Sequence, residues 1–352
     1  MLLAAHSLGC LLLAWWAAHS RETARVAGAL LVAPPEIERA DLRQQIPGWA
    51  PPARQRLPFP CLVMASSDDP YASLDYAKTR LQGRPVGNGG KDASAPQVRL
   101  IEHADVKRML LAQKSYSEGA LALNLYCAKL VDEGRTGDAE AAAQAKLLLE
   151  VLTPIAKSWP SEFCLEANSL AIQIHGGYGY TRDFPVEQYW RDNRLNMIHE
   201  GTHGIQAADL LGRKVRMQGG AGLKLLAETV NTTVQKAMAY ESLALHANQL
   251  AKALAEVGAA TKAAWATEQP EEALANAVPY LQAFGHMVLA WMWLDVACSV
   301  LASDATQSDA QSAGRLAAAR YFFHYELPKI GAWLQVVRER DMTCAALSAD
   351  AF

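Results

Sequence analysis

The pattern of apolar and polar positions divides the chain into two unlike parts. Up to about residue 75, short continuous apolar runs alternate with proline-rich connections, and the runs 26–33 (VAGALLVA) and 61–66 (CLVMAS) have the length and composition of buried β-strands. After a predicted surface loop at 83–96 (GRPVGNGGKDASAP), the pattern is helical throughout. The sequence therefore predicts a small α/β segment followed by a long all-helical region.

The segment 102–132 carries the clearest helical stripe. Its apolar side chains recur at intervals of three and four residues, so we expect that face of the helix to pack inward. The residues of this stripe are Val106, Met109, Leu110, Leu121, Leu125 and Leu130.

The next segments predict two separate helices. The segment 139–158 is rich in Ala and Leu, and Pro154 should kink or end its helix. Ser161 should cap a following helix that the glycines at 176 and 177 stop. Further helical patterns cover 204–217, 222–257, 271–302 and 309–337, which predicts helix bundles in series.

Composition and charge exclude several classes of protein. The 33 Lys and Arg against 36 Asp and Glu leave a net charge of −3, so we expect no nucleic acid partner. The six cysteines form no C-x-x-C pair, which is typical of reduced thiols and argues against disulfides or a thiolate zinc site. No apolar run approaches the roughly 20 residues that span a bilayer, and the apolar run 11–18 lacks a positive flank. We therefore expect a cytoplasmic protein with no membrane partner.

The first motif that could carry chemistry is His6-Ser7-Leu8-Gly9, a loose version of the nucleophile elbow of serine hydrolases. An elbow needs a strand in front of it, and the pattern predicts none there. The stretches HSLGCLLLAWWAAHS, RVAGALLVAPP and LPFPCLVMASSDDPY resemble small serine hydrolases of the retinoblastoma-binding-protein-9-like family.

This resemblance implies Ser7 as the nucleophile and Asp69 as the acid. The family's histidine follows in a GH-type turn, which is absent here, and His103 lies at a suitable distance but in the helical region. Without a base the serine hydroxyl stays protonated and weak. A serine hydrolase is therefore one of the less favoured functions.

The second motif is His199-Glu200-Gly201-Thr202-His203, which satisfies the zincin pattern H-E-x-x-H. A zincin holds both histidines on one helix, and the internal glycine weakens such a helix by roughly 1 kcal/mol relative to alanine. Glu228 is the only downstream candidate for a third ligand. We expect no metal here, and a zinc metalloprotease is also less favoured.

The surroundings of Glu200 form a more specific pattern. Three pieces occur in order: Gln173 with Gly176 and Gly177 in QIHGGYGY, the run RDNRLNMI at 191–198, and Glu200-Gly201-Thr202 followed by a Gly-Ile-Gln triplet. Together they resemble the C-terminal helical domain of the acyl-CoA dehydrogenases. The run YAKTRLQGR at 76–84 is similar to the branch that contains methylmercaptopropionyl-CoA dehydrogenases, which usually has Asn where this chain has His203.

The resemblance implies an oxidoreductase that desaturates an acyl-CoA thioester with FAD as cofactor. It makes Glu200 the base that removes the α-proton while the β-hydride passes to N5 of the flavin, and it places Thr202 at the flavin. It matches Gln173, Gly176 and Gly177 to the segment that approaches the adenosine diphosphate of FAD in a neighbouring subunit. Arg80 matches the arginine that pairs with pyrophosphate. The family also implies a homo-oligomer and electron-transfer flavoprotein as the electron acceptor.

The acyl-CoA dehydrogenase resemblance covers roughly residues 74 to 352. It does not cover the family's N-terminal helical domain or its middle β-domain. The predicted fold is mainly α: a truncated α/β-hydrolase-like fragment at 1–73, an acyl-CoA dehydrogenase C-terminal helical bundle at 74–218 and an additional helical domain at 219–352. We interpret the chain as a fusion of two truncated genes. It is either a dehydrogenase, inactive if the absent domains are not supplied, or an inactive fusion remnant that is only a structural helical protein.

Overall fold

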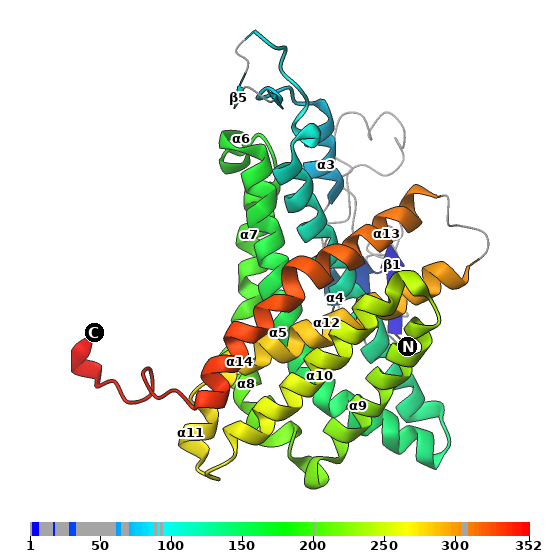
Figure 1. Cartoon of the computed structure of the whole chain (residues 1–352), viewed down its shortest axis with the longest axis vertical. Helices are drawn as coiled ribbons and strands as arrows, with labels where there is room; N and C mark the ends of the chain where they lie inside the picture. Colours follow the sequence, from blue (N-terminus) through cyan, green and yellow to red (C-terminus); the bar gives the residue numbers. More distant parts are fainter. Residues whose placement is uncertain are drawn as a thin grey trace.

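The computed structural model describes residues 2–6, 17, 28–32, 61–64, 70–87, 90–91, 94–199, 201–303 and 309–352. Most of these residues are helical, and the long helices lie beside one another in a bundle (Figure 1). The predicted mainly α fold is therefore confirmed.

A small parallel sheet stands at the beginning of the chain. Its strands are β1 (Leu2–His6), β2 (Gly28–Val32) and β3 (Cys61–Met64), in the order β1-β2-β3. β2 and β3 confirm the two predicted strands. β1 corrects the expectation that no strand precedes Ser7, because its last residue, His6, comes directly before that serine. Its sequence LLAAH has no β-branched residue, which hid the strand from the pattern. Ser7 and Asp69 lie outside the described residues.

Two long helices form the frame of the helical region. After α3 (Pro70–Thr79), the hairpin strands β4 (Val86–Gly87) and β5 (Gly90–Lys91), and the short turn η3 (Leu100–Glu102), the chain forms α4 (Ala104–Thr136) and α5 (Ala139–His175). The hairpin lies within the segment predicted to be only a loop. α4 and α5 pack along each other, and Asp138 caps α5 by accepting a hydrogen bond from the Ala141 N–H at 2.9 Å.

Helix α5 corrects the prediction of two helices in this region. It continues through Pro154 and Pro160 as far as His175, and Ser161 lies inside it with its Oγ donating to the Ser158 carbonyl at 2.8 Å. Each proline removes one backbone hydrogen bond. Burial of the helix against its neighbours offsets that loss, because most helix stability in proteins comes from packing of the apolar face.

The stripe predicted for α4 is confirmed in part. Val106, Met109 and Leu130 are buried, whereas Leu125 is 53% exposed. The exposed leucine shows that the inward face of this helix is narrower near its middle than the sequence pattern indicates.

The remaining helices follow α5 in short and long pieces. They are α6 (Gly177–Tyr180), α7 (Val186–Asn193), η4 (Arg194–Met197), α8 (His203–Asp209), η5 (Leu210–Lys214), α9 (Met217–Met238), η6 (Glu241–Leu243), α10 (Ala244–Ala264), α11 (Pro270–Leu274), α12 (Ala277–Ala302), α13 (Ala310–Tyr321), η7 (Phe322–Glu326), η8 (Leu327–Lys329), α14 (Ile330–Glu339) and η9 (Ala349–Ala351). The helical patterns predicted at 204–217, 222–257, 271–302 and 309–337 are each divided among more than one element in the structure.

Helix α12 is the central helix of the bundle. It packs against α4, α5, α9, α10, α13 and α14, and one continuous hydrophobic core joins residues from α4 to α14. Among the described helices it is the one long and apolar enough to cross a membrane, yet 78% of its apolar window is buried inside the protein. Its hydrophobicity is therefore used for packing between helices.

The contact between α12 and α5 is close and specific. Trp159 of α5 is buried, and its indole Nε1 donates to Nδ1 of His286 on α12 at 3.0 Å. The indole fits because Gly285 has no side chain: a Cβ there would lie 2.5 Å from Cδ1 of Trp159.

A buried carboxylate lies next to this contact. Glu326 accepts hydrogen bonds from the Tyr321 hydroxyl at 2.9 Å and from Lys329 Nζ at 2.6 Å, and His286 Nε2 is 3.6 Å from it. Burial opposes ionisation of Glu326, but His286 and Lys329 outweigh burial and lower the pKa of this carboxyl to about 2. Burial lowers the pKa of His286.

The close contact predicts opposite effects of one substitution at two glycines. Gly285→Ala should lower the free energy of unfolding by about 1–3 kcal/mol through overpacking against Trp159. Gly258→Ala, on exposed helical surface of α10 where a Cβ meets nothing within 4 Å, should raise it by about 0.5–1 kcal/mol. Urea unfolding followed by circular dichroism measures both. Equal effects at the two positions would contradict the packing described.

The buried histidines predict a loss of stability in mild acid. Burial lowers the pKa of His175, His246 and His286 in the folded protein, whereas in the unfolded chain each has its ordinary value of about 6.5. Below that pH the unfolded chain binds protons that the folded chain does not, so the free energy of unfolding should fall from pH 7 to pH 5. Glu326 does not contribute to this fall, because its own stabilisation is lost only as the pH drops from about 4.3 towards about 2.

Urea unfolding at both pH values tests this expectation. His246→Phe is the informative variant, because His246 stacks on Phe323 with ring centroids 4.6 Å apart and phenylalanine keeps that contact without titrating. The variant should show a smaller difference between pH 7 and pH 5 than the wild type. A wild-type stability that is equal at the two pH values would show that these histidines do not resist protonation.

Candidate functional site

The structure separates the predicted site residues into two groups along α5. Arg80, Gln173, Gly176 and Gly177 lie at the C-terminal end of this helix. Thr202 lies beside its middle, where the next residue, His203, contacts Ser158. His175 lies 17 positions after Ser158, and at 1.5 Å of rise per residue this is about 25 Å. One chain therefore presents two subsites.

An aromatic cluster builds the first subsite. Tyr76 of α3 stacks on His175 with ring centroids 4.4 Å apart, and Phe184 packs against both rings. The backbone N–H of Arg80 donates to the Tyr76 carbonyl at 2.9 Å, which continues the α3 helix by one bond. The Arg80 guanidinium carbon lies 5.9 Å from the ring centroid of Tyr178. Arg80 and the glycine turn are thus brought together, although Arg80 and Gly176 are 96 positions apart in the sequence.

The glycine turn offers exposed backbone. Gly176 ends α5 with a φ of +61°, a conformation that favours glycine, and its N–H donates to the Gln173 carbonyl at 3.2 Å. A Cβ built on Gly176 or Gly177 would meet no atom within 4 Å. The turn therefore has open space in front of its backbone, next to the positive charge of Arg80, and this combination suits a phosphate group. The predicted helix stop at these glycines is confirmed.

The second subsite lies just before α8. Glu200 is outside the described residues, and its flanks define the turn. Gly201 has a φ of +103°, a conformation that residues with a side chain rarely adopt, so this position favours glycine. Thr202 is the N-cap residue of α8, and its exposed side chain makes no capping hydrogen bond.

Ser158 and His203 anchor this turn to α5. The Ser158 hydroxyl, which is buried, hydrogen-bonds Nδ1 of His203, and within the described part of the chain His203 Nε2 is buried without a partner. Sequence reasoning missed this pair. The two residues are 45 positions apart and belong to no common motif, so the sequence contains no signal for their contact.

The zincin-like motif does not have the geometry of a zincin. His199 is exposed in the turn before Thr202, and its Nδ1 lies 3.2 Å from the Leu195 carbonyl oxygen. α8 begins only at His203, so the two histidines do not share one helix. Among the residues that the structure describes, no group of three or more His, Cys, Asp or Glu could hold a metal ion.

His103, the histidine considered for a serine hydrolase triad, contacts a backbone carbonyl group. His103 precedes α4, and its Nε2 lies 2.8 Å from the Gln82 carbonyl oxygen. With Ser7 and Asp69 outside the described residues, the structure supplies no geometry for a serine triad.

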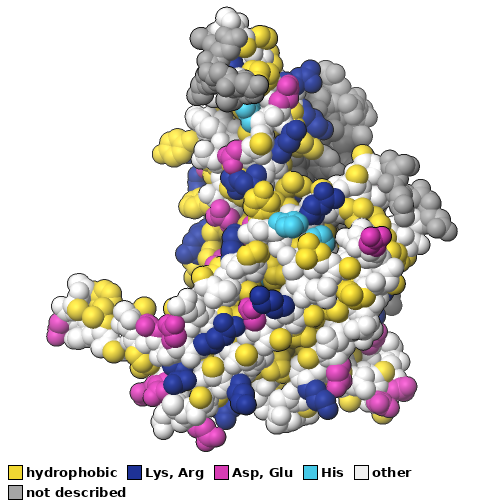
Figure 2. Space-filling model, viewed as in Figure 1, with side chains coloured by type: hydrophobic (Ala, Val, Ile, Leu, Met, Phe, Trp, Pro, Cys, Tyr) yellow, Lys and Arg dark blue, Asp and Glu magenta, His cyan; other side chains and the backbone are white. Residues whose placement is uncertain are grey.

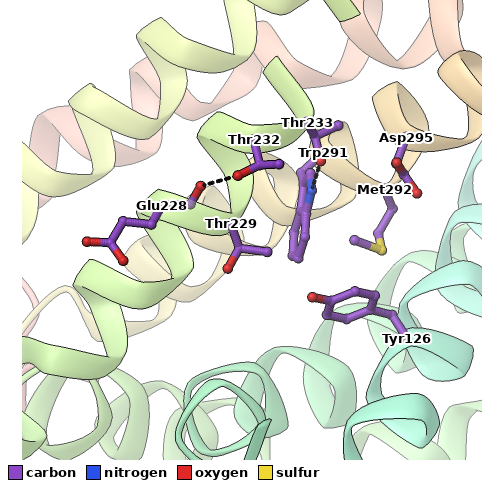
Figure 3. A pocket seen from close by; sticks show the side chains of 8 residues that line it. All are labelled: Tyr126, Glu228, Thr229, Thr232, Thr233, Trp291, Met292 and Asp295. Atoms are coloured by element: carbon purple, nitrogen blue, oxygen red, sulfur yellow. Dashed lines mark hydrogen bonds between the residues drawn. The ribbon is translucent and has the colours of Figure 1, made fainter. Parts of the chain in front are cut away.

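A groove between α4, α9 and α12 is separate from both subsites (Figure 3). Its volume is about 320 Å³, and it is lined by Tyr126, Glu228, Thr229, Thr232, Thr233, Trp291, Met292 and Asp295. Trp291 donates to Thr233 Oγ1 at 2.9 Å, and burial raises the pKa of Tyr126 to about 12. No residue of the two subsites lines this groove.

Comparison with known families assigns most of the chain. Residues 91–215 match the family described as acyl-CoA dehydrogenase, C-terminal domain, and residues 226–348 match acetyl-CoA dehydrogenase C-terminal like. Residues 1–84 match the serine hydrolase family. The helical region is therefore built from C-terminal domains of the acyl-CoA dehydrogenase family, preceded by a serine hydrolase segment.

The chain is similar to 3-methylmercaptopropionyl-CoA dehydrogenase. It is 37% identical to that protein of Ruegeria pomeroyi over 239 residues, covering 66% of this chain and 39% of the relative. It is also 30% identical over 295 residues to the broad-specificity linear acyl-CoA dehydrogenase FadE5 of Mycobacterium tuberculosis, covering 80% of this chain and 48% of the relative.

A solved structure shares the fold. The acyl-CoA dehydrogenase from Bacillus anthracis, complexed with FAD, matches with a TM-score of 0.60 at 17% identity, covering 81% of this chain and 47% of that chain. The chain thus spans less than half the length of each of these three proteins.

The motif geometry predicts that the purified protein binds no stoichiometric zinc. His199 and His203 lie on either side of a glycine turn, which cannot place two imidazoles one helical turn apart. After dialysis into a buffer that contains zinc and removal of the unbound metal, elemental analysis should find far less than one zinc ion per chain. The His203→Ala variant should contain equally little. About one zinc per chain that His203→Ala removes would contradict this prediction.

Proposed function

We propose that this chain takes part in FAD-dependent α,β-dehydrogenation of an acyl-CoA thioester. The observation that carries the proposal is the pairing of Arg80 with the open Gly176-Gly177 turn, in a chain whose helical region matches acyl-CoA dehydrogenase C-terminal domains. A guanidinium beside unobstructed backbone fits the pyrophosphate of a dinucleotide, which needs positive charge and close approach.

The first subsite would hold the adenosine diphosphate end of the cofactor. Arg80 would pair with the pyrophosphate, and Gln173, Gly176 and Gly177 would line the approach. The second subsite, with Thr202, would face the flavin ring. The separation of about 25 Å along α5 supports the expectation that the two subsites of one chain serve cofactors in neighbouring subunits of a homo-oligomer.

Bound FAD would supply the hydride acceptor. Glu200 would remove the α-proton of the thioester, because a carboxylate beside Cα is the base that this chemistry needs. The negative charge that develops on the thioester oxygen needs a hydrogen-bond donor, and the resemblance gives this role to the backbone N–H of Glu200. Gly201, fixed at positive φ, would turn the backbone directly after this residue. The Ser158–His203 contact would hold the turn against α5.

The remaining features of the proposal come from the family resemblance. Electron-transfer flavoprotein would be the electron acceptor, and an acyl-CoA of unspecified chain length the substrate. The cytoplasm would be the location, a proposal that rests on the scattered cysteines and not on the resemblance. The competing function is a helical protein without dehydrogenase activity. Flavin content separates the two, because only a dehydrogenase should purify with FAD.

Substitutions at Glu200 and Arg80 test the proposal with different readouts. Glu200→Gln should leave FAD binding intact and slow anaerobic flavin bleaching by acyl-CoA by about 10²–10⁴-fold, because the shape is kept and the proton acceptor is lost. Arg80→Ala should instead weaken FAD binding, measured by fluorescence titration. Arg135→Ala, at the far end of α4, is the matched control and should change neither quantity.

Two outcomes would count against the proposed roles. Equal bleaching rates in wild type and Glu200→Gln would place the base elsewhere. Wild-type protein that is colourless and takes up no FAD in the titration would favour the helical protein without activity.

A further inference from the structure

The groove between α4, α9 and α12 lies apart from both subsites and has features of a ligand site. Its volume of about 320 Å³ is in the range of small-molecule sites. The groove also lies where the two matched helical regions meet, because Tyr126 belongs to residues 91–215 and the other lining residues belong to residues 226–348. Pockets for small molecules occur preferentially at junctions between domains. The position of the groove is therefore one that ligands commonly use.

The floor of the groove is aromatic and apolar. Trp291 and Met292 are buried there, and the ring of Tyr126 meets the indole of Trp291 edge to face, with ring centroids 5.0 Å apart. An ammonium group of the protein itself lies on this cluster, since Lys129 Nζ is 5.9 Å from the ring centroid of Tyr126. Aromatic rings attract cations in this way. The floor therefore offers apolar contact to an alkyl chain and favours positive charge beside it.

The threonine hydroxyl groups that line the groove can accept hydrogen bonds. Thr229 and Thr232 donate their own hydrogens to carbonyl groups of α9, at 2.8 Å and 3.1 Å, so their oxygen lone pairs remain as acceptors. The indole N–H of Trp291 donates to Thr233 Oγ1 at 2.9 Å. A ligand that binds to these threonine oxygens must therefore bring its own hydrogen-bond donors.

Two carboxylates line the groove, and none of the eight described residues that line it is Lys or Arg. Figure 3 shows Glu228 and Asp295 on opposite sides of Trp291, with Thr229 and Thr232 on the side of Glu228. Phosphate and carboxylate groups would be repelled on both sides, which disfavours FAD and acyl-CoA as ligands of this groove. A ligand with a positive group at each end suits the arrangement.

Local contacts, and not the charge of the whole molecule, select the ligand. The net charge is only −3, and Figure 2 shows Lys and Arg interspersed with Asp and Glu over the face that it displays. Two lysines outside the groove pair with its carboxylates: Lys236 Nζ lies 3.5 Å from Asp295, and Lys224 Nζ lies 3.9 Å from Glu228. Both pairs are exposed, and exposed ion pairs contribute little. An ammonium group in the groove therefore competes only with weak contacts.

We propose that this groove binds a short aliphatic diamine with both amino groups protonated. One ammonium group donates to the Asp295 carboxylate. The other lies on the α9 side, where Glu228, Thr229 and Thr232 supply acceptors. The alkyl chain between them crosses the floor at Trp291. The site does not depend on flavin binding or on dehydrogenase activity, so it can fail while the proposed function holds, and the reverse.

Calorimetric titration of the full chain at pH 7 tests the class of ligand, with putrescine as a four-carbon diamine. Both of its amino groups are protonated at that pH. Butylamine has the same chain with one ammonium group and should bind about tenfold more weakly, because it lacks one charged hydrogen-bonding end. Butanol carries no charge and should give no measurable binding. All titrations are made at one ionic strength, so that screening by the diamine does not differ between them.

Substitutions at the carboxylate and at its lysine should act in opposite directions. Asp295→Asn should weaken putrescine binding about tenfold, because the charged acceptor is lost. Lys236→Met should strengthen it, because the ligand then no longer shares Asp295 with an ammonium group of the protein. The matched control is Asp105→Asn near the start of α4, an aspartate that pairs with Arg108 at 2.7 Å outside the groove and should leave binding unchanged. Circular dichroism checks that each variant keeps its helices.

Methyl NMR of protein with labelled methionine locates the bound diamine. The signal of Met292, identified by its loss in Met292→Leu, should shift when putrescine is added, because this side chain lines the groove. The signal of Met109, which lies in a separate apolar cluster, should not move.

Three results would overturn the proposal. The first is no binding of putrescine by the folded wild type. The second is binding of butanol as tight as that of putrescine, which would show an apolar site only. The third is equal binding by wild type and Asp295→Asn, or a Met292 signal that does not move, because the diamine would then lie elsewhere. Flavin content measured in the same samples reports separately on the proposed function.

Discussion

The continuity of α5 is the constraint on which the rest of the helical region depends. Trp159 lies directly before Pro160, in the part of the helix where two prolines each remove a backbone hydrogen bond. Its indole is buried against Gly285 and donates to His286, both on the central helix α12. This packing holds α5 to the bundle at the point where its own hydrogen bonding is weakest, and it lets one helix carry both subsites.

Much of the fold could be predicted from the sequence, and the failures have physical causes. The helical periodicity after residue 75 and the glycine stop at Gly176 are local properties, and both are found. The continuation of α5 through its prolines is decided by burial against helices more than 100 residues away in the sequence, which no local pattern reports. β1 was missed because LLAAH has helix-forming residues, and only pairing with β2 makes it a strand.

The candidate site also has features that the sequence indicates and features that only the tertiary fold produces. The order of QIHGGYGY, RDNRLNMI and Glu200-Gly201-Thr202 was sufficient to indicate the family, because it depends on residue identity alone. The proximity of Arg80 to Tyr178 could not be predicted, since it follows from stacking of Tyr76 on His175 across two helices. The Ser158–His203 contact is likewise tertiary. In the sequence, His203 completes the H-E-x-x-H metal-binding motif. In the structure, its Nδ1 hydrogen-bonds Ser158 and so holds the turn against α5.

Apolar side chains are buried on one side of α5 and exposed on the other. On the side of α12, apolar side chains are buried in a single core, and even an apolar helix long enough to cross a membrane is enclosed. On the side of α6 to α8, apolar residues are left exposed among balanced charges. Since the same helix supports both faces, a shift of α5 caused by overpacking at Gly285 would be transmitted to the exposed side chains of α6 to α8 and to both subsites. The core and the two candidate subsites are therefore linked through one helix, although they occupy separate surfaces.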